Sequence, residues 1–248
     1  MDPEHRQHRS RVRLEWGPVG AEALAPVDVA VVVDVLSFTT TLTVAVERGI
    51  EVFPFLWRDE RAAAFAAERD AVLAEQRQDA GGAAGAAGVS LSPASVAAAE
   101  GVRRLVLPSP NGSTISTLLA GSGATVVGAC LRNRSAVAAW LVPRVTAGAA
   151  VAVVPAGERW PDGSLRPAVE DLWGAGAVLD ALGSADLSAE ASAAVAAFRA
   201  AALPDALVAC SSGRELAAKG FGADVDIAAE VDASTAVPVL RDGVFVAG

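Results

Sequence analysis

Histidine is nearly absent from the sequence, and its two histidines, His5 and His8, both lie in the first eight of 248 residues. Tyrosine is missing altogether, and cysteine occurs only at Cys130 and Cys210. A histidine-based catalytic triad or zinc site would have to recruit a side chain from this N-terminal end, so neither is expected. Chemistry is instead expected from carboxylates, hydroxyls, amides and arginines, a set that suits Mg²⁺ better than zinc.

Other absences bear on location and partners. No apolar run reaches the ~20 residues that a membrane helix needs. The basic N-terminal segment lacks the apolar stretch and cleavage site of a secretory signal, and the cysteines have no metal-type spacing. With 20 Lys and Arg against 29 Asp and Glu, the net charge is −9, which disfavours nucleic acid and anionic membranes as partners. We therefore expect a cytoplasmic protein that binds neither.

The sequence pattern favours an α/β fold. Hydrophobic residues make up 52% of the chain, while aromatics are only 5%. Apolar, β-branched segments alternate with polar loops and amphipathic helices, and Gly17, Pro18 and Gly20 are predicted to form a turn after the first strand. Such units predict a three-layer α/β/α architecture with a mostly parallel sheet. The main predicted strands are residues 11–16, 29–33, 51–56, 103–107, 125–128 and 150–154.

The predicted organisation is a single α/β domain over residues 11–248, with two lobes as the alternative. Residues 1–10 are expected to be disordered. The low-complexity segment near residues 76–90 predicts a flexible loop, either a lid or an ordinary surface loop. Residues 237–246 predict a C-terminal hairpin that turns at Asp242 and Gly243 and makes the sheet mixed, at an exposed edge.

The first candidate site follows a buried strand. Residues 29–33 are an unbroken aliphatic run, which is typical of a strand covered on both faces. Asp34 comes next, and the hydroxyls of Thr39, Thr40 and Thr41 follow at the predicted start of a helix. A carboxylate at a strand's carboxyl end, beside the amides of a helix N-terminus, can hold a divalent cation and a phosphate together.

Two further loops follow predicted strands. Asn111, Gly112 and Ser113 precede a helix, where they offer amides and a close backbone approach to a phosphate, although the same residues also suit a turn and a cap. Glu158 and Arg159 lie in the next loop. The planar guanidinium of Arg159 suits a phosphate or sulfonate, and it equally suits a surface ion pair.

Three acidic residues complete the candidates. Glu170 and Asp171 begin an apolar helix, where acids also complement the helix dipole. Asp224 lies in another predicted helix, and a solvated position is the simpler interpretation for it. Taken alone, the Asn111 loop, the Glu170-Asp171 pair and Asp224 each favour an ordinary structural role, so these candidates depend on the combination of the motifs.

In combination these motifs resemble the 2-phosphosulfolactate phosphatase family. They occur in the family's order from about residue 28 onward. The motifs are Asp34-Val-Leu with Thr39-Thr-Thr41, Pro110-Asn-Gly-Ser113, Ala156-Gly-Glu158, Glu170-Asp171 with Gly174-Ala-Gly176, and Gly220-Phe-Gly-Ala-Asp224 with Asp232 and Val237-Pro238. The resemblance implies an α/β fold and the Mg²⁺-dependent hydrolysis of a phosphate monoester in coenzyme M biosynthesis.

The resemblance also implies roles for the candidate residues. The expected substrate is a small, anionic, phosphorylated metabolite, whose distal acid Arg159 would hold. The expected catalytic residues are Asp34, Glu170 and Asp171, and Asp224 joins them as an expected Mg²⁺ ligand. The expected phosphate- and substrate-binding residues are Thr39, Thr40, Thr41, Asn111, Gly112, Ser113, Glu158 and Arg159.

The sequence departs from the family's pattern within the motifs. Ser37 and Phe38 stand where the family usually has an arginine and a small residue, and Gln76 stands in place of a glutamate. Leu91 replaces an asparagine, and Ser212 replaces a histidine. These departures keep two alternatives open, namely a catalytically degenerate anion-binding protein and a phosphatase that acts on another small metabolite. The predicted hairpin and the tryptophans are also compatible with a homodimer.

Overall fold

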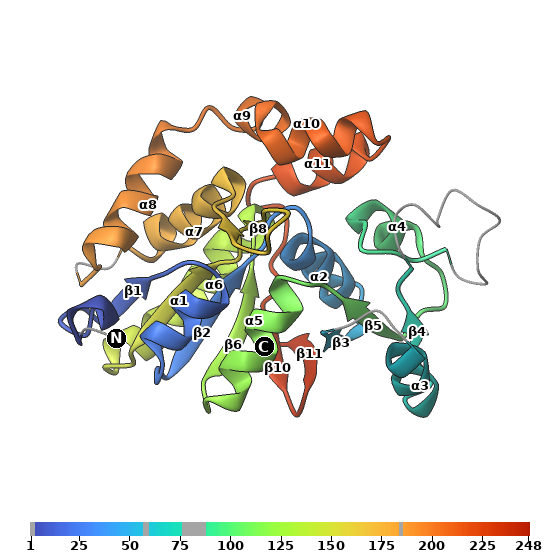
Figure 1. Cartoon of the computed structure of the whole chain (residues 1–248), viewed down its shortest axis with the longest axis horizontal. Helices are drawn as coiled ribbons and strands as arrows, with labels where there is room; N and C mark the ends of the chain where they lie inside the picture. The colour runs from blue at the N-terminus through green and yellow to red at the C-terminus, as the bar shows by residue number, and fades with distance from the viewer. Residues whose placement is uncertain (1–2, 57–59, 76–87, 184–185) are drawn as a thin grey trace.

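The computed structural model describes residues 3–56, 60–75, 88–183 and 186–248. Nine strands form one continuous sheet with helices on both faces (Figure 1). The predicted α/β class and the mostly parallel, mixed sheet are confirmed. Among the described helices, none combines the length and the apolar character that crossing a membrane would require.

The sheet consists of two parallel parts joined by an antiparallel hairpin. The strands lie in the order β1 (Val12–Leu14), β7 (Val151–Pro155), β2 (Val29–Val33), β6 (Thr125–Ala129), β10 (Pro238–Arg241), β11 (Val244–Ala247), β3 (Glu51–Phe55), β5 (Arg104–Pro108) and β4 (Val72–Leu73). We call β1, β7, β2 and β6 the first half-sheet, and β3, β5 and β4 the second. Neighbours within each half-sheet are parallel, whereas β6–β10, β10–β11 and β11–β3 are antiparallel. Three reversals make the half-sheets run in opposite directions.

The C-terminal hairpin was predicted correctly, but its predicted place at an exposed edge is wrong. It lies in the middle of the sheet, where Val239 pairs with Val127 of β6 and Phe245 pairs with Val52 of β3. The ring of Phe245 is fully buried and meets the ring of Phe38 edge-on, with the centroids 6.3 Å apart. The hairpin therefore holds the two half-sheets together through the apolar core.

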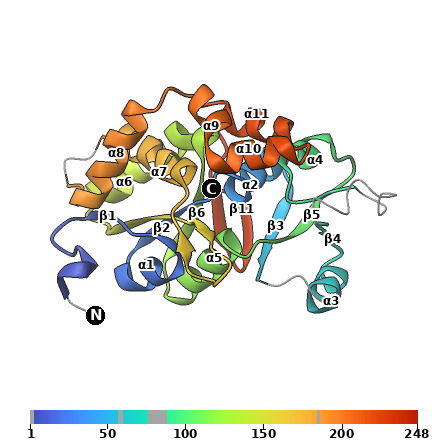
Figure 2. The ribbon, with the colours of Figure 1, turned by 45° about the horizontal axis from the view of Figure 1, so that its top comes forward.

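Helices cover both faces of the first half-sheet (Figure 2). Alternate residues of β2 face opposite layers, because side chains alternate along a strand. Val29, Val31 and Val33 belong to the core formed with α6 (Arg134–Thr146), α7 (Val169–Leu182) and α8 (Ala189–Ala200). Ala30 and Val32 belong to the second core, formed with α1 (Gly17–Leu24), α2 (Phe38–Glu47) and α5 (Gly112–Gly121). The predicted three-layer arrangement is thus confirmed.

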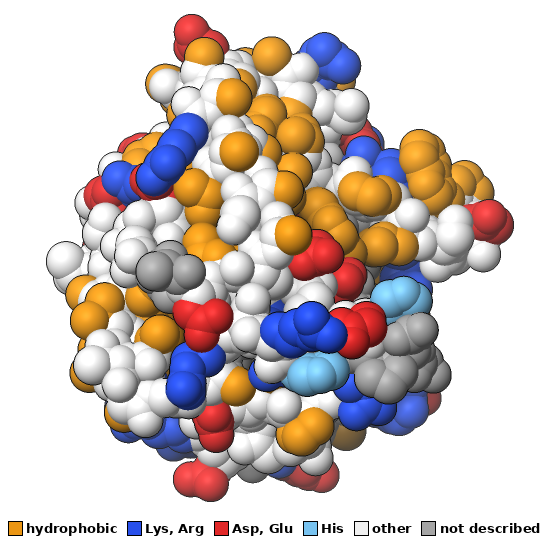
Figure 3. Space-filling model, turned by 90° about the vertical axis from the view of Figure 1, so that its left-hand side faces the viewer, with side chains coloured by type: hydrophobic (Ala, Val, Ile, Leu, Met, Phe, Trp, Pro, Cys, Tyr) orange, Lys and Arg blue, Asp and Glu red, His pale blue; other side chains and the backbone are white. Residues whose placement is uncertain are grey.

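The remaining elements are short. Figure 1 shows a group of three helices, α9 to α11, at the top of the molecule above the small β8–β9 hairpin. These elements are α3 (Glu60–Glu68), α4 (Pro93–Ala98), α9 (Asp205–Ala209), α10 (Ser211–Ala218), α11 (Gly222–Ala229), β8 (Glu158–Arg159) and β9 (Leu165–Arg166). On the face that carries β1 and α8, acidic and basic side chains are mixed, and hydrophobic ones gather in its upper part (Figure 3).

The predicted turn at Gly17, Pro18 and Gly20 is wrong, because α1 begins there. Proline's fixed φ suits the first turn of a helix, and Gly20 packs closely on Glu15, where a Cβ would lie 2.7 Å from the Glu15 Cβ. In the segment predicted to be disordered, residues 3–6 form a 3-10 helix, and the Gln7 side chain donates to the carbonyl of Leu14 (2.9 Å). Most of the predicted loop near residues 76–90, including Gln76, lies outside the described residues.

Candidate active site

Asp34 lies between the N-termini of two helices. It follows β2 directly, and its side chain is only 7% exposed. Its Oδ1 accepts a hydrogen bond from the amide of Phe38 at the start of α2 (3.2 Å). Its Oδ2 accepts one from the amide of Gly112 at the start of α5 (3.1 Å). The carboxylate is therefore held where the positive ends of two helix dipoles meet.

Gly112 is required for this approach. A Cβ at this position would lie 2.2 Å from the ring of Phe38, too close for any side chain. Gly112 follows β5, which belongs to the second half-sheet, whereas Asp34 follows β2 in the first. The two loops meet because α5 packs back against β2 and β6. Their strands are not neighbours in the sheet.

Asp171 connects two loops of the site. It is 3% exposed in the first turn of α7. Its Oδ1 accepts from the amide of Val35 (2.7 Å), and its Oδ2 accepts from the amide of Gly157 (2.9 Å). Val35 follows β2 and Gly157 follows β7, so this single carboxylate fixes both loop backbones next to Asp34 and Glu158.

Glu158 and Glu170 complete a group of acids that we call the carboxylate cluster: Asp34, Glu158, Glu170 and Asp171. Glu158 is half-buried at the start of the β8–β9 hairpin, and its Oε2 accepts from Nδ2 of Asn111 (3.4 Å). Glu170 is 2% exposed at the start of α7. The three loops that sequence patterns singled out therefore do converge.

Electrostatics within the cluster follow from burial and like charge. Burial raises the pKa of Asp34 to about 7, and the charges of Glu158 and Glu170 add to the rise, while its two amide hydrogen bonds oppose it. Burial, then Asp34 and Glu170, raise the pKa of Asp171 well above its usual value. Burial also raises the pKa of Glu158, although the nearby Arg166 lowers it. A cation bound here would relieve this repulsion.

The start of α10 borders the cluster. Burial raises the pKa of the Cys210 thiol to about 11, and the charge of Glu170 contributes. Two residues later, the buried Ser212 accepts a hydrogen bond from Nη2 of Arg166 (3.2 Å). Sequence reasoning missed Arg166. It chose Arg159, which is exposed and donates to the carbonyl of Gly163 at the hairpin's turn (3.5 Å).

The predicted phosphate-binding hydroxyls are buried and hold the backbone. Thr39 Oγ1 donates to the carbonyl of Asp34, and Thr40 Oγ1 donates to that of Val35, both at 2.8 Å. Thr41 Oγ1 donates to the carbonyl of Leu91 at 2.8 Å. Ser113 Oγ behaves alike, donating to the carbonyl of Leu107 at 3.0 Å. Each hydroxyl proton is thus engaged, so these groups shape the loops around Asp34.

Asp224 is equally buried, at 1% exposure, but it lies with different partners. Its carboxylate accepts hydrogen bonds from the hydroxyl of Ser92 and the amide of Ala94 (3.2 Å). These residues begin α4, so Asp224 joins α11 to α4. These two hydrogen bonds tie Asp224 to the start of α4 rather than to the carboxylate cluster.

The donor chemistry of the cluster fits Mg²⁺, which prefers carboxylate oxygens. Within the described ranges, no group of three or more acidic, histidine or cysteine side chains is already arranged around a metal position. Mg²⁺ in phosphoryl-transfer sites is commonly held by one or two carboxylates, with water and substrate phosphate as the other ligands. Asp34 and Glu170 can supply two such carboxylates.

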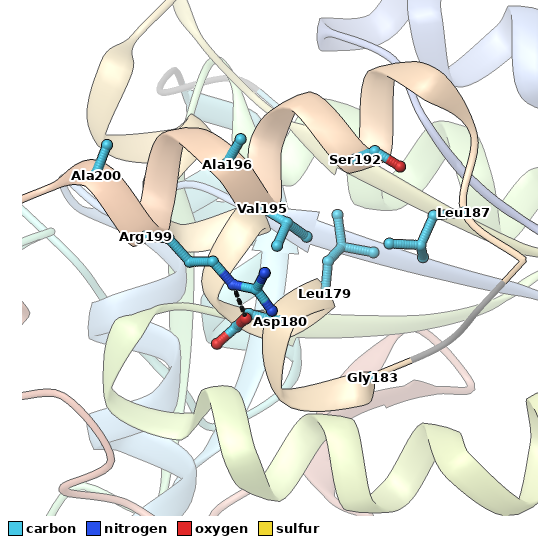
Figure 4. A pocket seen from close by; sticks show the side chains of 9 residues that line it. All are labelled: Leu179, Asp180, Gly183, Leu187, Ser192, Val195, Ala196, Arg199 and Ala200. Atoms are coloured by element: carbon cyan, nitrogen blue, oxygen red, sulfur yellow. Dashed lines mark hydrogen bonds and ion pairs between the residues drawn. The ribbon is translucent and has the colours of Figure 1, made fainter.

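A pocket of about 170 Å³ opens beside the cluster, and Leu36, Glu158 and Ser212 are among the residues that line it. Its other lining residues are Glu215, Leu216, Lys219 and Phe221. A larger pocket of about 710 Å³ lies between α7 and α8, where Asp180 and Arg199 form an ion pair (2.7 Å; Figure 4). That pocket is at the opposite end of α7 from Glu170, away from the cluster.

Comparisons with known proteins all point to one family. The family model described as 2-phosphosulpholactate phosphatase matches residues 20–243. A protein of Thermus thermophilus named "Probable 2-phosphosulfolactate phosphatase" is 35% identical over 242 residues, which cover 93% of this chain and 95% of the relative. One of the same name from Deinococcus radiodurans is 32% identical over 225 residues, covering 87% and 89%.

Proposed function

Because the chain belongs to the 2-phosphosulfolactate phosphatase family, we propose that it hydrolyses 2-phosphosulfolactate, or a closely similar small acid, with Mg²⁺. The family resemblance expected from the sequence motifs is confirmed, and with it the enzyme class, a phosphoric monoester hydrolase. The observation that carries the proposal is the carboxylate cluster at the N-terminus of α5. It combines acidic metal ligands with a helix dipole that attracts phosphate.

Asp34 and Glu170 are the residues that would hold Mg²⁺. When bound, the ion supplies charge neutralisation for the phosphoryl oxygens and lowers the pKa of a coordinated water. Binding requires ionised carboxylates, and the raised pKa of Asp34 means that protons compete with the metal up to about pH 7.

The chain's own residues orient the substrate and move a proton. The N-terminus of α5 directs its dipole at a phosphate beside Asp34. Asp171 accepts hydrogen bonds from the amides of Val35 and Gly157 and so keeps both neighbouring loops in place. Glu158 lies at the edge of the cluster with a pKa that burial raises, and it is the candidate to give a proton to the leaving alkoxide oxygen. Each Asp34 oxygen accepts one amide hydrogen bond and keeps a further lone pair, so direct attack by water and attack by Asp34 are both compatible with the site.

Phosphate release from a panel of phosphate monoesters tests the proposal. The panel contains 2-phosphosulfolactate, phosphoglycolate and p-nitrophenyl phosphate, each assayed with Mg²⁺ and with EDTA. We expect the highest kcat/KM for 2-phosphosulfolactate, and activity that EDTA abolishes and Mg²⁺ restores. Hydrolysis that is insensitive to both EDTA and Asp34→Asn would contradict the proposed site.

A second candidate is a binding protein that has lost turnover. The observation in its favour is Ser212, which stands where the family pattern has a histidine and here bonds with Arg166. Thermal stabilisation by 2-phosphosulfolactate, without phosphate release over a long incubation, would select this candidate. We also propose that the enzyme acts in coenzyme M biosynthesis, that it is located in the cytoplasm and that it forms a homodimer. Sedimentation analysis tests the last of these.

A further inference from the structure

The β8–β9 hairpin presents two arginines on opposite faces. Its register pairs Glu158 with Arg166, and Arg159 with Leu165. Residues directly opposite each other in an antiparallel pair lie on the same face of the ribbon. Arg166 therefore shares the face of Glu158, which belongs to the carboxylate cluster. Arg159 shares the face of Leu165, whose side chain packs over Gly157.

Two contacts, with Ser212 and with Trp160, hold the guanidinium of Arg166 where its charge acts on Glu158 of the cluster. Its Nη2 donates to Ser212 Oγ (3.2 Å), and its charge lowers the pKa of Glu158. Its Cζ lies 5.8 Å from the centre of the Trp160 ring, within cation–π range. Arginine carries five N–H donors, more than the bond to Ser212 uses, and the side chain is half-buried. The group is thus fixed in place and still accessible to a ligand.

The pocket of about 170 Å³ places a binding volume next to this arginine. Ser212, the partner of Arg166, lines it, and so does Glu158. Leu36, two residues after Asp34, lines the same pocket and connects it to the phosphate end of the site. Lys219 adds a second cation, held by Glu215 at 2.6 Å. The volume suits a small acidic group, since one water takes about 30 Å³.

We propose that Arg166, oriented by Ser212, binds the second acidic group of the substrate while the phosphate lies beside Asp34. This inference rests on the proposed function and names the residue that selects among its substrates. The acids of the cluster repel a carboxylate or sulfonate, so a substrate carrying one needs a fixed cation there. The planar fork of an arginine matches such a group in two parallel hydrogen bonds. Phosphate esters that lack a second acid make no use of Arg166.

The two arginines of the hairpin supply a matched pair of variants. Arg166→Gln should raise KM for 2-phosphosulfolactate by about 10- to 100-fold, the usual effect of losing a charge-assisted bond, with kcat within about threefold. Because Arg166 also acts on Glu158, p-nitrophenyl phosphate serves as the reference substrate for the same variant, and its kcat/KM should fall by a factor at least about tenfold smaller than that for 2-phosphosulfolactate. Arg159→Gln should match the wild type on both substrates, and Arg166→Lys should recover part of the lost affinity.

A binding measurement separates this inference from the proposed function. Isothermal titration with sulfolactate measures binding without turnover, because this ligand carries the carboxylate and the sulfonate of the substrate but no phosphate. If the wild type hydrolyses nothing but binds sulfolactate, and Arg166→Gln abolishes that binding, the proposed function fails and the inference stands. An Arg166→Gln protein that keeps wild-type KM and sulfolactate affinity overturns it. Equal losses in both glutamine variants, or a loss in Arg159→Gln alone, overturn it as well.

Discussion

The carboxylate cluster and Asp224 are two buried acidic regions that differ in how closely other carboxylates surround them. Asp224 is 1% exposed, and its carboxylate accepts from Ser92 and Ala94 at the beginning of α4. Asp34 is 7% exposed and also accepts hydrogen bonds from two backbone amides. In addition, the charges of Glu158 and Glu170 lie near enough to raise the pKa of Asp34 further. Burial is common to both regions, and proximity of like charges distinguishes the cluster.

The difference shows how to separate a functional acid from a structural one. An acid that closes a helix N-terminus is stabilised locally and needs no ligand. Acids held against one another store repulsion that folding alone does not relieve, which is the arrangement found where proteins bind cations or transfer protons. Four variants or conditions test this distinction.

Asp34→Asn should cause the largest loss. It removes a charge from the proposed metal site, and we expect kcat/KM to fall by at least about 1,000-fold, equivalent to about 4 kcal/mol. Steady-state phosphate release with saturating Mg²⁺ measures it, and circular dichroism checks that the variant is folded. Retention of more than a tenth of wild-type activity would show that Asp34 has no part in catalysis or metal binding.

The pH dependence of stability should follow from the raised pKa of Asp34. The folded protein keeps this proton up to about pH 7, while the unfolded chain ionises near pH 4, so unfolding releases a proton between these values. Without divalent cations, stability should therefore fall as pH rises from 4 to about 7, by on the order of a few kcal/mol. Urea unfolding at a series of pH values measures this slope.

Asp34→Asn is the control for that slope, because the asparagine does not titrate. Its stability should depend less steeply on pH than that of the wild type, and Mg²⁺ should stabilise only the wild type near pH 8. Parallel slopes for the two proteins would show that Asp34 ionises normally.

Asp171→Asn should have an intermediate effect. The amide nitrogen of asparagine cannot accept a hydrogen bond, so the variant loses the bond to either Val35 or Gly157. We expect kcat/KM to fall by about 10- to 100-fold through displacement of Asp34 or Glu158. Asp180→Asn, on the same helix, is the matched control and should remain active. Equal activities of the two variants would deny Asp171 its positioning role.

Asp224→Asn should have the smallest effect on activity. Loss of an acceptor at the start of α4 should cost about 1–2 kcal/mol of stability and leave kcat/KM within about threefold of the wild type. A titration of activity against Mg²⁺ distinguishes the two interpretations of this residue. A more than tenfold rise in the Mg²⁺ needed for half-maximal activity would make Asp224 a metal ligand, as the family resemblance implies.

Much of the fold could be predicted because its signals are local. The aliphatic run at residues 29–33 and the turn at Asp242 and Gly243 each identify their strands without tertiary information. The position of the hairpin could not be predicted in this way. Pairing of β10 with β6 and β11 with β3 depends on contacts such as Phe245 against Phe38, between residues about 200 positions apart in the chain.

The site could be predicted in part for the same reason. Asp34, Glu158, Glu170 and Asp171 were found because strand ends and helix starts predict where side chains converge. Arg166, which we propose as a binding residue, was not among the sequence candidates because each strand of its hairpin has two residues, too few for an alternation to appear in the sequence. Predictions for the hydroxyls of residues 39–41 took no account of nearby carbonyls, which the fold places within 2.8 Å.

The position of β10 and β11 also affects the order in which the protein can be assembled. These strands follow all the others in the chain, yet they lie between the two half-sheets. During synthesis the N-terminal strands emerge first, so each half-sheet can form early, but the two cannot be joined until residues 238–247 leave the ribosome. Asp34 and Gly112 come from different half-sheets. The sheet can therefore be completed only after residues 238–247 have been made, whereas the contact between Asp34 and Gly112 also has the support of α5, which packs against β2 and β6.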